Sequence, residues 1–315
     1  MLDPQVKKVL SRQTDSGTDS TETVTVAEAR RVFSESRTNF KEIVKTVSSV
    51  KNLSIDCPYG KIPIRIYTPE GDGPFPVLVF FHGGGFVLGD LNTTDNICKY
   101  FANGAECIVV SGDYRLAPEH RFPAAVDDAY FATQWVENNA HTFKGDPLRI
   151  AVGGESAGGN LAAVVSLLAR TNKTPALQFQ LLIYPCVQFG METQSMIDCG
   201  EKYNLTVSEM KWFGDHYFSD NIQMTNKLAS PLLAENLEGL PPALVVTAEF
   251  DPLRDEGEQY ADRLASFGVR VRKKCYPGMV HSFFNYSGEV DQSKIALDET
   301  VKELRNIFYS RLIES

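Results

Sequence analysis

The stretch Gly154-Glu155-Ser156-Ala157-Gly158 decides how the rest of the chain is interpreted. A strand-like apolar run at residues 149–152 precedes it, and a helical pattern begins at Asn160. Small residues on both sides allow the sharp strand-to-helix turn that lifts a serine hydroxyl out at the top of a sheet. The pattern alone arises by chance in roughly one chain in ten of this length, so its context carries the argument. We therefore predict a nucleophile at Ser156.

Apolar runs without polar alternation recur along the chain, each beside a helical pattern, and such runs are typical of strands buried on both faces. Before them, the apolar positions in residues 53–55 and 62–66 alternate with polar ones about a turn, as in an antiparallel hairpin. We expect an α/β fold whose mostly parallel, twisted sheet starts with an antiparallel pair and is covered by helices on both faces. The buried runs are residues 76–81, 107–110, 149–152, 177–184 and 243–248.

Two segments depart from this rhythm. Residues 11–25 are rich in Ser, Thr and Asp, which predicts a mobile linker. The spacing of Thr25 and Glu28 then predicts the start of an amphipathic helix, and a second helix is expected around residues 40–47. Residues 187–226 form a polar insert that contains several aromatic side chains.

The loop His82-Gly83-Gly84-Gly85 follows the buried run that ends at Phe81. Consecutive glycines let main-chain N–H groups face a substrate oxygen without interference from Cβ atoms. A flexible turn is the alternative, but these four residues in this order arise by chance in only about one chain in 500. We therefore predict an oxyanion loop here.

A nucleophilic serine needs a base and an orienting carboxylate, which follow it in the order acid and then histidine, each just past a strand. Asp251 and His281 meet this requirement. Asp255 and Glu256 are rival acids, but they are expected one turn into a helix, where they would support Asp251 or cap that helix. The histidines that fail the requirement are His82, His120, His141 and His216.

Five sequence motifs, taken in their order along the chain, resemble those of the bacterial hormone-sensitive-lipase family of carboxylesterases. The resemblance covers residues 65–285 and implies an α/β-hydrolase fold with Ser156 as nucleophile, His281 as general base and Asp251 as its orienter. It also implies that an oxyanion would bind the N–H groups of Gly83, Gly84 and Ala157. The motifs are His82-Gly-Gly-Gly85, Asp113-Tyr-Arg-Leu-Ala-Pro-Glu119, Gly154-Glu-Ser-Ala-Gly-Gly159, Asp251-Pro-Leu-Arg-Asp-Glu-Gly257 and Tyr276-Pro-Gly-Met-Val-His281.

The resemblance further implies short- to medium-chain ester substrates, no cofactor and a helical cap. Trp212 and Phe213 are the cap residues expected to contact substrate. Glu155 departs from the family, which usually has Asp or Thr there, and this leaves the geometry next to the nucleophile open. The expected cap is residues 1–48 and 187–226, over a core of residues 49–186 and 227–315.

Two other functions share these motifs. A deacetylase or amidase that acts on acylated small molecules would use the same triad with a different pocket. A ligand receptor similar to the plant gibberellin receptors would have the same fold without the triad histidine, and His281 argues against it. Asp113 and Arg115 are expected to form an architectural, buried charge pair near the oxyanion glycines.

Composition excludes several partners. Lys and Arg total 31 against 40 Asp and Glu in 315 residues, a net charge of −9 that disfavours nucleic acid. No apolar stretch approaches the roughly 20 residues that span a bilayer, and charges at Asp3, Lys7 and Lys8 interrupt any secretory signal, so we expect a cytoplasmic protein. The six cysteines lack C-x-x-C spacing, which predicts neither a disulfide framework nor a metal site. The expected partner is a small ester, and the resemblance allows a homodimer.

Overall fold

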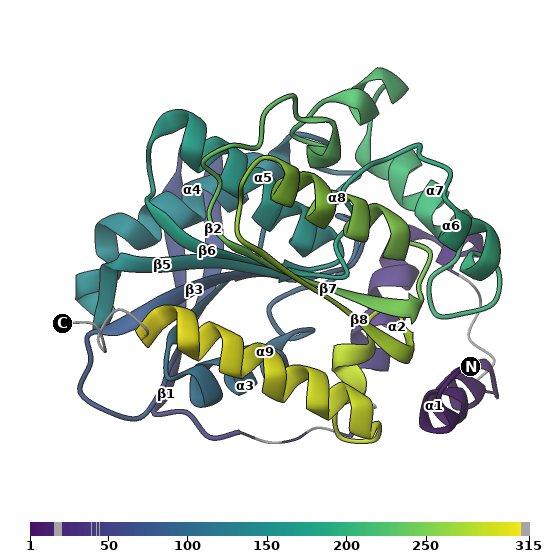
Figure 1. Cartoon of the computed structure of the whole chain (residues 1–315), viewed down its shortest axis with the longest axis horizontal. Coiled ribbons are helices and arrows are strands. Elements are labelled where there is room, and N and C mark those ends of the chain that lie inside the picture. Colours follow the sequence, from purple (N-terminus) through teal and green to yellow (C-terminus); the bar gives the residue numbers. More distant parts are fainter. Residues whose placement is uncertain (16–20, 39, 42, 44, 310–315) are drawn as a thin grey trace.

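A computed structural model of the chain describes residues 1–15, 21–38, 40–41, 43 and 45–309. The strands in these residues are β1 (Ser49–Cys57), β2 (Gly60–Thr68), β3 (Phe75–Phe81), β4 (Ile108–Gly112), β5 (Gly145–Glu155), β6 (Leu177–Ile183), β7 (Ala243–Phe250) and β8 (Val271–Val280). They form one twisted sheet in the order β1-β2-β4-β3-β5-β6-β7-β8 (Figure 1). The pairs β1–β2 and β2–β4 are antiparallel, and all other pairs are parallel. The predicted fold class is confirmed.

The sequence pattern of each strand matches its place in the sheet. Every residue of β3 and β4 is buried, because helices cover both faces of the parallel part. In β2 the isoleucines Ile62, Ile64 and Ile66 are buried at alternate positions and Tyr67 is buried as well, whereas in β1 only Ile55 is buried. Cys57 pairs with Gly60, so the predicted hairpin turn lies between these strands.

Helices cover the sheet on both faces (Figure 1). Side chains of α4 (Ala124–Asn139), α5 (Ala157–Asn172) and α8 (Arg254–Ser266) share one apolar cluster with Val77, Val79 and Phe81 of β3. Leu78 and Phe80 point to the opposite face, where they pack with α3 (Asp95–Ala105) and α9 (Asp291–Tyr309). The strand period of two therefore divides the core into two layers.

The amino-terminal segment differs from the predicted linker. Residues 11–15 are not linker but the end of α1 (Pro4–Asp15), which is anchored because Val6 and Val9 are buried against the second layer; residues 16–20 lie outside the described part. Thr23 ends a short turn, η1 (Thr21–Thr23), and α2 (Val26–Thr38) begins where predicted, with the Glu28 N–H donating to the Thr25 hydroxyl.

The prediction of a helix around residues 40–47 is wrong, because none of the described residues there is helical. Residues 42 and 44 lie outside the described part. The apolar side chains of this segment are used to anchor it. Phe40 packs edge-on against Tyr286 with ring centroids 5.0 Å apart, and Ile43 and Val47 pack against the second layer. Apolar residues at helical spacing thus do not show that a helix forms.

The insert contains the helices α6 (Gln194–Cys199) and α7 (Val207–Tyr217) and the short turn η3 (Asn221–Thr225), and the short turn η4 (Pro231–Leu233) follows it. Two further turns, η2 (Ala140–Phe143) and η5 (Phe283–Tyr286), follow α4 and β8. Within the described part of the chain, every helix is too short or too polar to cross a membrane.

Candidate active site

Ser156 stands on the turn between β5 and α5, with a backbone φ of 56° and ψ of −118°. A non-glycine residue is strained at such a φ, and glycines around it allow the chain to turn. A Cβ on Gly158 would lie 2.0 Å from the carbonyl oxygen of Phe81, at the end of β3. Gly154 is similarly confined, with its Cβ position 2.3 Å from Gly158. The glycines of the motif are therefore required for the close approach of helix and sheet.

The structure brings Ser156, Asp251 and His281 together at the carboxyl ends of β5, β7 and β8. His281 Nε2 lies 2.9 Å from Ser156 Oγ, and His281 Nδ1 lies 2.7 Å from Asp251 Oδ2. A carboxylate can only accept, so Nδ1 carries the proton and Nε2 is free to accept from the serine hydroxyl. Asp251 is fully buried, and its other oxygen accepts from the Leu253 N–H at 2.9 Å. This arrangement can deprotonate a serine.

The three N–H groups expected in an oxyanion hole are available. In the described residues, no carbonyl or side chain accepts a hydrogen bond from the N–H of Gly83, Gly84 or Ala157. Gly84 has a φ of 113°, and a Cβ there would lie 2.3 Å from the Leu88 carbonyl oxygen, so only glycine fits. Free donors beside a nucleophile are what a developing oxyanion needs.

The loop that carries these glycines is held from behind. His82 donates from Nδ1 to the Gly83 carbonyl at 2.7 Å and stacks on Tyr114 with ring centroids 4.3 Å apart. The expected ion pair of Asp113 with Arg115 is wrong. Arg115 instead pairs with Asp128, a fully buried residue of α4, at 2.8 Å, because its side chain points toward that helix. Asp113 Oδ1 lies 3.8 Å from His82 Nε2.

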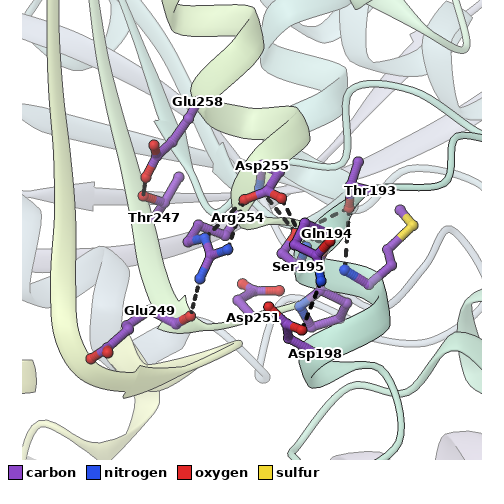
Figure 2. A network of polar contacts seen from close by, with 12 residues as sticks. Thr193, Gln194, Ser195, Asp198, Thr247, Glu249, Asp251, Arg254, Asp255 and Glu258 are labelled. Atoms are coloured by element: carbon purple, nitrogen blue, oxygen red, sulfur yellow. Dashed lines mark hydrogen bonds and ion pairs between the residues drawn. The ribbon is translucent and has the colours of Figure 1, made fainter. Parts of the chain in front are cut away.

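Neither rival acid supports Asp251 directly. Asp255 accepts from the Ser195 N–H at 2.8 Å, and Glu256 accepts from the Val187 N–H at 2.7 Å, so both hold the insert. Burial raises the pKa of Glu256 to about 8. Figure 2 shows the contacts of Asp255 and Ser195 beside Asp251. Ser195 also donates to the carbonyl of Pro252 at 2.8 Å, which ties α6 to the loop that carries the triad acid. No local sequence signal marks Ser195, because its partners Pro252 and Asp255 are distant in the chain.

Glu155 is buried, and its carboxylate accepts hydrogen bonds from other side chains. Its Oε2 accepts from the Tyr184 hydroxyl at 2.6 Å and from Asn285 at 3.4 Å. Burial raises the pKa of Tyr184 well above its ordinary value, and the charge of Glu155 adds to this rise, so the phenol keeps its proton. The Tyr184 ring meets the imidazole of His281 edge-on at 4.9 Å. Glu155 therefore fixes a tyrosine that packs against the base, a contact that no sequence motif indicates.

Two cavities meet at the serine. The first, of about 180 Å³, lies between α2 and His281; the second, of about 300 Å³, lies under the insert. Phe213 is one of the residues that line both cavities. Trp212 lies outside both linings and packs edge-on against Phe213, with ring centroids 5.4 Å apart. The residues common to both linings are Gly85, Ser156, Leu205 and Phe213.

The described residues contain no group of three or more His, Cys, Asp or Glu side chains arranged to hold a metal ion. Ser156, His281 and Asp251, joined by hydrogen bonds, and the free N–H groups beside them can together support acyl transfer.

Comparison with known proteins shows which family the chain belongs to. Residues 78–285 match a family model described as alpha/beta hydrolase fold. The chain is 46% identical over 264 residues to the carboxylic ester hydrolase LipN of Mycobacterium tuberculosis, which covers 81% of this chain and 70% of LipN. An arylesterase of Saccharolobus solfataricus is 39% identical over 82% of this chain and 84% of its own. The structure of an esterase from Pyrobaculum calidifontis superposes with a TM-score of 0.92, at 39% identity over 97% of this chain and 98% of that one.

Proposed function

The chain belongs to the alpha/beta-hydrolase family and is a carboxylic ester hydrolase, and from that premise we propose that it hydrolyses short- to medium-chain esters through an acyl-enzyme on Ser156. The resemblance to hormone-sensitive-lipase-type carboxylesterases is confirmed. One observation supports the proposed mechanism most strongly. Hydrogen bonds join Asp251 to His281 and His281 to Ser156, and Ser156 lines both cavities.

The proposed cycle has two halves. His281 Nε2 takes the hydroxyl proton of Ser156 as the oxygen attacks the ester carbonyl, while Asp251 stabilises the imidazolium that forms. The N–H groups of Gly83, Gly84 and Ala157 hold the negative oxygen of the tetrahedral intermediate. The imidazolium then gives its proton to the leaving alcohol, and the acyl group stays on the serine. In the second half His281 activates a water molecule that releases the acid.

The two cavities differ in their access to the base, and this supports an assignment of the two parts of the ester. His281 lines the first cavity but not the second. Because the imidazolium must reach the oxygen of the leaving alcohol, we assign the alcohol to the first cavity. The acyl chain then occupies the second, where Met191, Met196, Met210 and Met224 supply adaptable apolar walls.

The proposed cap, residues 1–48 and 187–226, supplies walls of both cavities. Val32 and Phe33 of α2 line the first cavity, and Met210 of α7 lines the second. Phe213 presses on the oxyanion loop, since a Cβ on Gly85 would lie 2.3 Å from its ring. These contacts support a cap that closes over the serine.

Two wider proposals accompany this function. The six cysteines are all free thiols, which supports a reducing compartment, so the proposed location is the cytoplasm. The homodimer rests on the family resemblance, and light scattering during gel filtration tests it.

Substitution of the nucleophile tests the function. Ser156→Ala should lower turnover of p-nitrophenyl butanoate by about 10⁶ and leave folding intact, because the hydroxyl stands at a turn and little packing is lost. A fluorophosphonate probe should label the natural protein and not the variant. Ser266→Ala, at the exposed end of α8, is the matched control and should keep both activity and labelling. Activity of a few per cent in Ser156→Ala would refute the assignment.

A survey of substrates then separates the function from its alternatives. We expect hydrolysis of p-nitrophenyl esters and little of matched acylamides. Faster turnover of the amides would favour the deacetylase or amidase.

A further inference from the structure

Arg37 of α2 is the one arginine among the residues that line the first cavity, and it also lines a smaller cavity of about 50 Å³. The charged side chains that line the first cavity besides the triad histidine are Arg37 and Glu209. They have different surroundings, and the difference indicates what the cavity binds.

Glu209 is occupied by contacts within the protein. Its Oε1 accepts from the Thr21 hydroxyl at 3.0 Å, and its Oε2 accepts from the Thr206 N–H at 3.0 Å. The second contact belongs to the capping box that begins α7. Burial raises the pKa of Glu209, which further weakens it as a partner for a cationic ligand. Its role is to join η1 to the insert.

Arg37 has no such partner. No carboxylate in the described residues lies within ion-pair distance of it, and its guanidinium stacks over the Phe33 ring at 4.7 Å. The other two arginines of the same helix are both paired, Arg30 with Glu119 at 2.7 Å and Arg31 with Glu28 at 2.6 Å. The arginine of α2 that has no ion-pair partner among the described residues is therefore the one that lines the cavity.

The charge of Arg37 acts within the cavity. Burial raises the pKa of Tyr286, another lining residue, to about 12, and the positive charge of Arg37 opposes this rise. A guanidinium presents five N–H donors in a planar fork that matches a carboxylate or a phosphate. Its stacking on Phe33 holds the plane of the fork without using those donors.

We propose that Arg37 is a subsite for an anionic group on the alcohol part of the ester, so that the preferred substrates are esters of hydroxy acids or of other anionic alcohols. This rests on the proposed function and on the assignment of the first cavity to the alcohol. Arg37 binds the anion, the ester carbonyl lies at Ser156, and the acyl chain extends into the second cavity. Neutral esters are hydrolysed without this contact.

Matched substrates test the subsite. The first pair is the butanoyl ester of 4-hydroxybutanoate and that of 4-hydroxybutanamide, which differ in the charge on the alcohol side. The second pair, monobutyl succinate and butyl succinamate, places the same difference on the acyl side. For each pair we take the ratio of kcat/KM for the anionic ester to that for the neutral one. This ratio does not depend on how much of a variant is folded.

In the natural protein the alcohol-side ratio should exceed the acyl-side ratio. Arg37→Gln should lower the alcohol-side ratio roughly tenfold to a hundredfold, as expected for loss of a charge-assisted contact, while Arg37→Lys should lower it less. Arg31→Gln removes an equal charge from the exposed side of the same helix and should leave the ratio unchanged.

Three results would overturn the subsite: an alcohol-side ratio that Arg37→Gln leaves unchanged, an equal fall in Arg31→Gln, or a fall confined to the acyl-side pair. The last result would also reverse the cavity assignment. These failures are distinct from failure of the proposed function, in which the natural protein would hydrolyse neither neutral ester.

Discussion

The triad and the cavities around it come from different parts of the chain. Ser156, Asp251 and His281 stand at strand ends in the core and are joined by hydrogen bonds of 2.7 and 2.9 Å. The cavity walls come largely from α2 and from the insert. The rate and the selectivity should therefore depend on different residues. Substitutions in the core should slow the hydrolysis of all esters alike, whereas substitutions in the cavity walls should alter the ratios of the rates for different esters.

The strongest test of this comparison is Asp251→Asn. An amide cannot stabilise the imidazolium and favours the wrong tautomer of His281, so kcat should fall about 10⁴-fold. The loss should be the same for p-nitrophenyl acetate, butanoate and octanoate. Asp255→Asn is the matched control, since that carboxylate holds Ser195 rather than the imidazole, and it should lose far less. A loss in Asp251→Asn that depends strongly on chain length would break the comparison.

Glu256, which connects the core to the insert, should make the unfolding free energy depend on pH. The folded state raises the pKa of Glu256 to about 8 by burial, so between its unfolded and folded pKa values only the folded protein holds this proton. The stability due to this site is therefore present at low pH and lost as pH rises. Relative to Glu256→Gln, the natural protein should lose about 1.4 kcal/mol of unfolding free energy per pH unit between roughly pH 5 and 8.

Urea unfolding of both proteins across this pH range measures the difference, and effects of other titrating groups cancel in it. The glutamine oxygen can still accept from the Val187 N–H, so the contact itself is retained in the variant. A difference that does not change with pH would show that Glu256 is not buried as the structure has it.

The core site could be predicted from sequence because its chemistry depends on local signals in a fixed order. A strained serine needs small neighbours, an oxyanion loop needs glycines, and the histidine must follow the acid. Each requirement leaves a trace within a few residues. The same applies to the parallel strands, whose burial on both faces shows as unbroken apolar runs.

The rest depends on contacts between distant residues, which leave no such trace. The Tyr184 hydroxyl reaches Glu155 across 29 positions, and Asp255 reaches Ser195 across 60. The sequence suggests Asp113, two positions away, as the partner of Arg115, but Arg115 pairs with Asp128 on α4. The apolar residues near Phe40 serve tertiary packing instead of a helix face. Tertiary packing determines the local conformation wherever it contributes more free energy than the helix propensity of the segment.

A wall residue should change selectivity instead of the overall rate. Each acyl methylene buried in the second cavity contributes about 0.8 kcal/mol until the cavity is full. We therefore expect kcat/KM for p-nitrophenyl esters to peak at roughly four to eight acyl carbons and to fall by about twelve. Phe213→Ala should move the peak to longer chains, because that ring closes the cavity beside Gly85. Trp212→Ala, which changes a residue outside both linings, should keep the peak in place.

The smallest effect is expected at Ser195, which belongs to the insert but touches the loop of Asp251 (Figure 2). Ser195→Ala leaves the Pro252 carbonyl and the Asp255 N–H without their hydroxyl partner, at a cost of about 1–3 kcal/mol in unfolding free energy. If the contact positions the triad acid, kcat should fall by less than about tenfold, equally for all chain lengths.

Gln194→Ala is the matched control for Ser195→Ala. Gln194 is exposed on the same helix and bonds only to Asp198 of that helix among the contacts drawn in Figure 2, so its loss should change neither stability nor rate appreciably. Melting temperature and the chain-length series measure both variants. A loss in Ser195→Ala that grows with chain length would place Ser195 with the walls. A uniform loss would place it with the core, because the insert would then act on the triad through the acid loop as well as on the substrate.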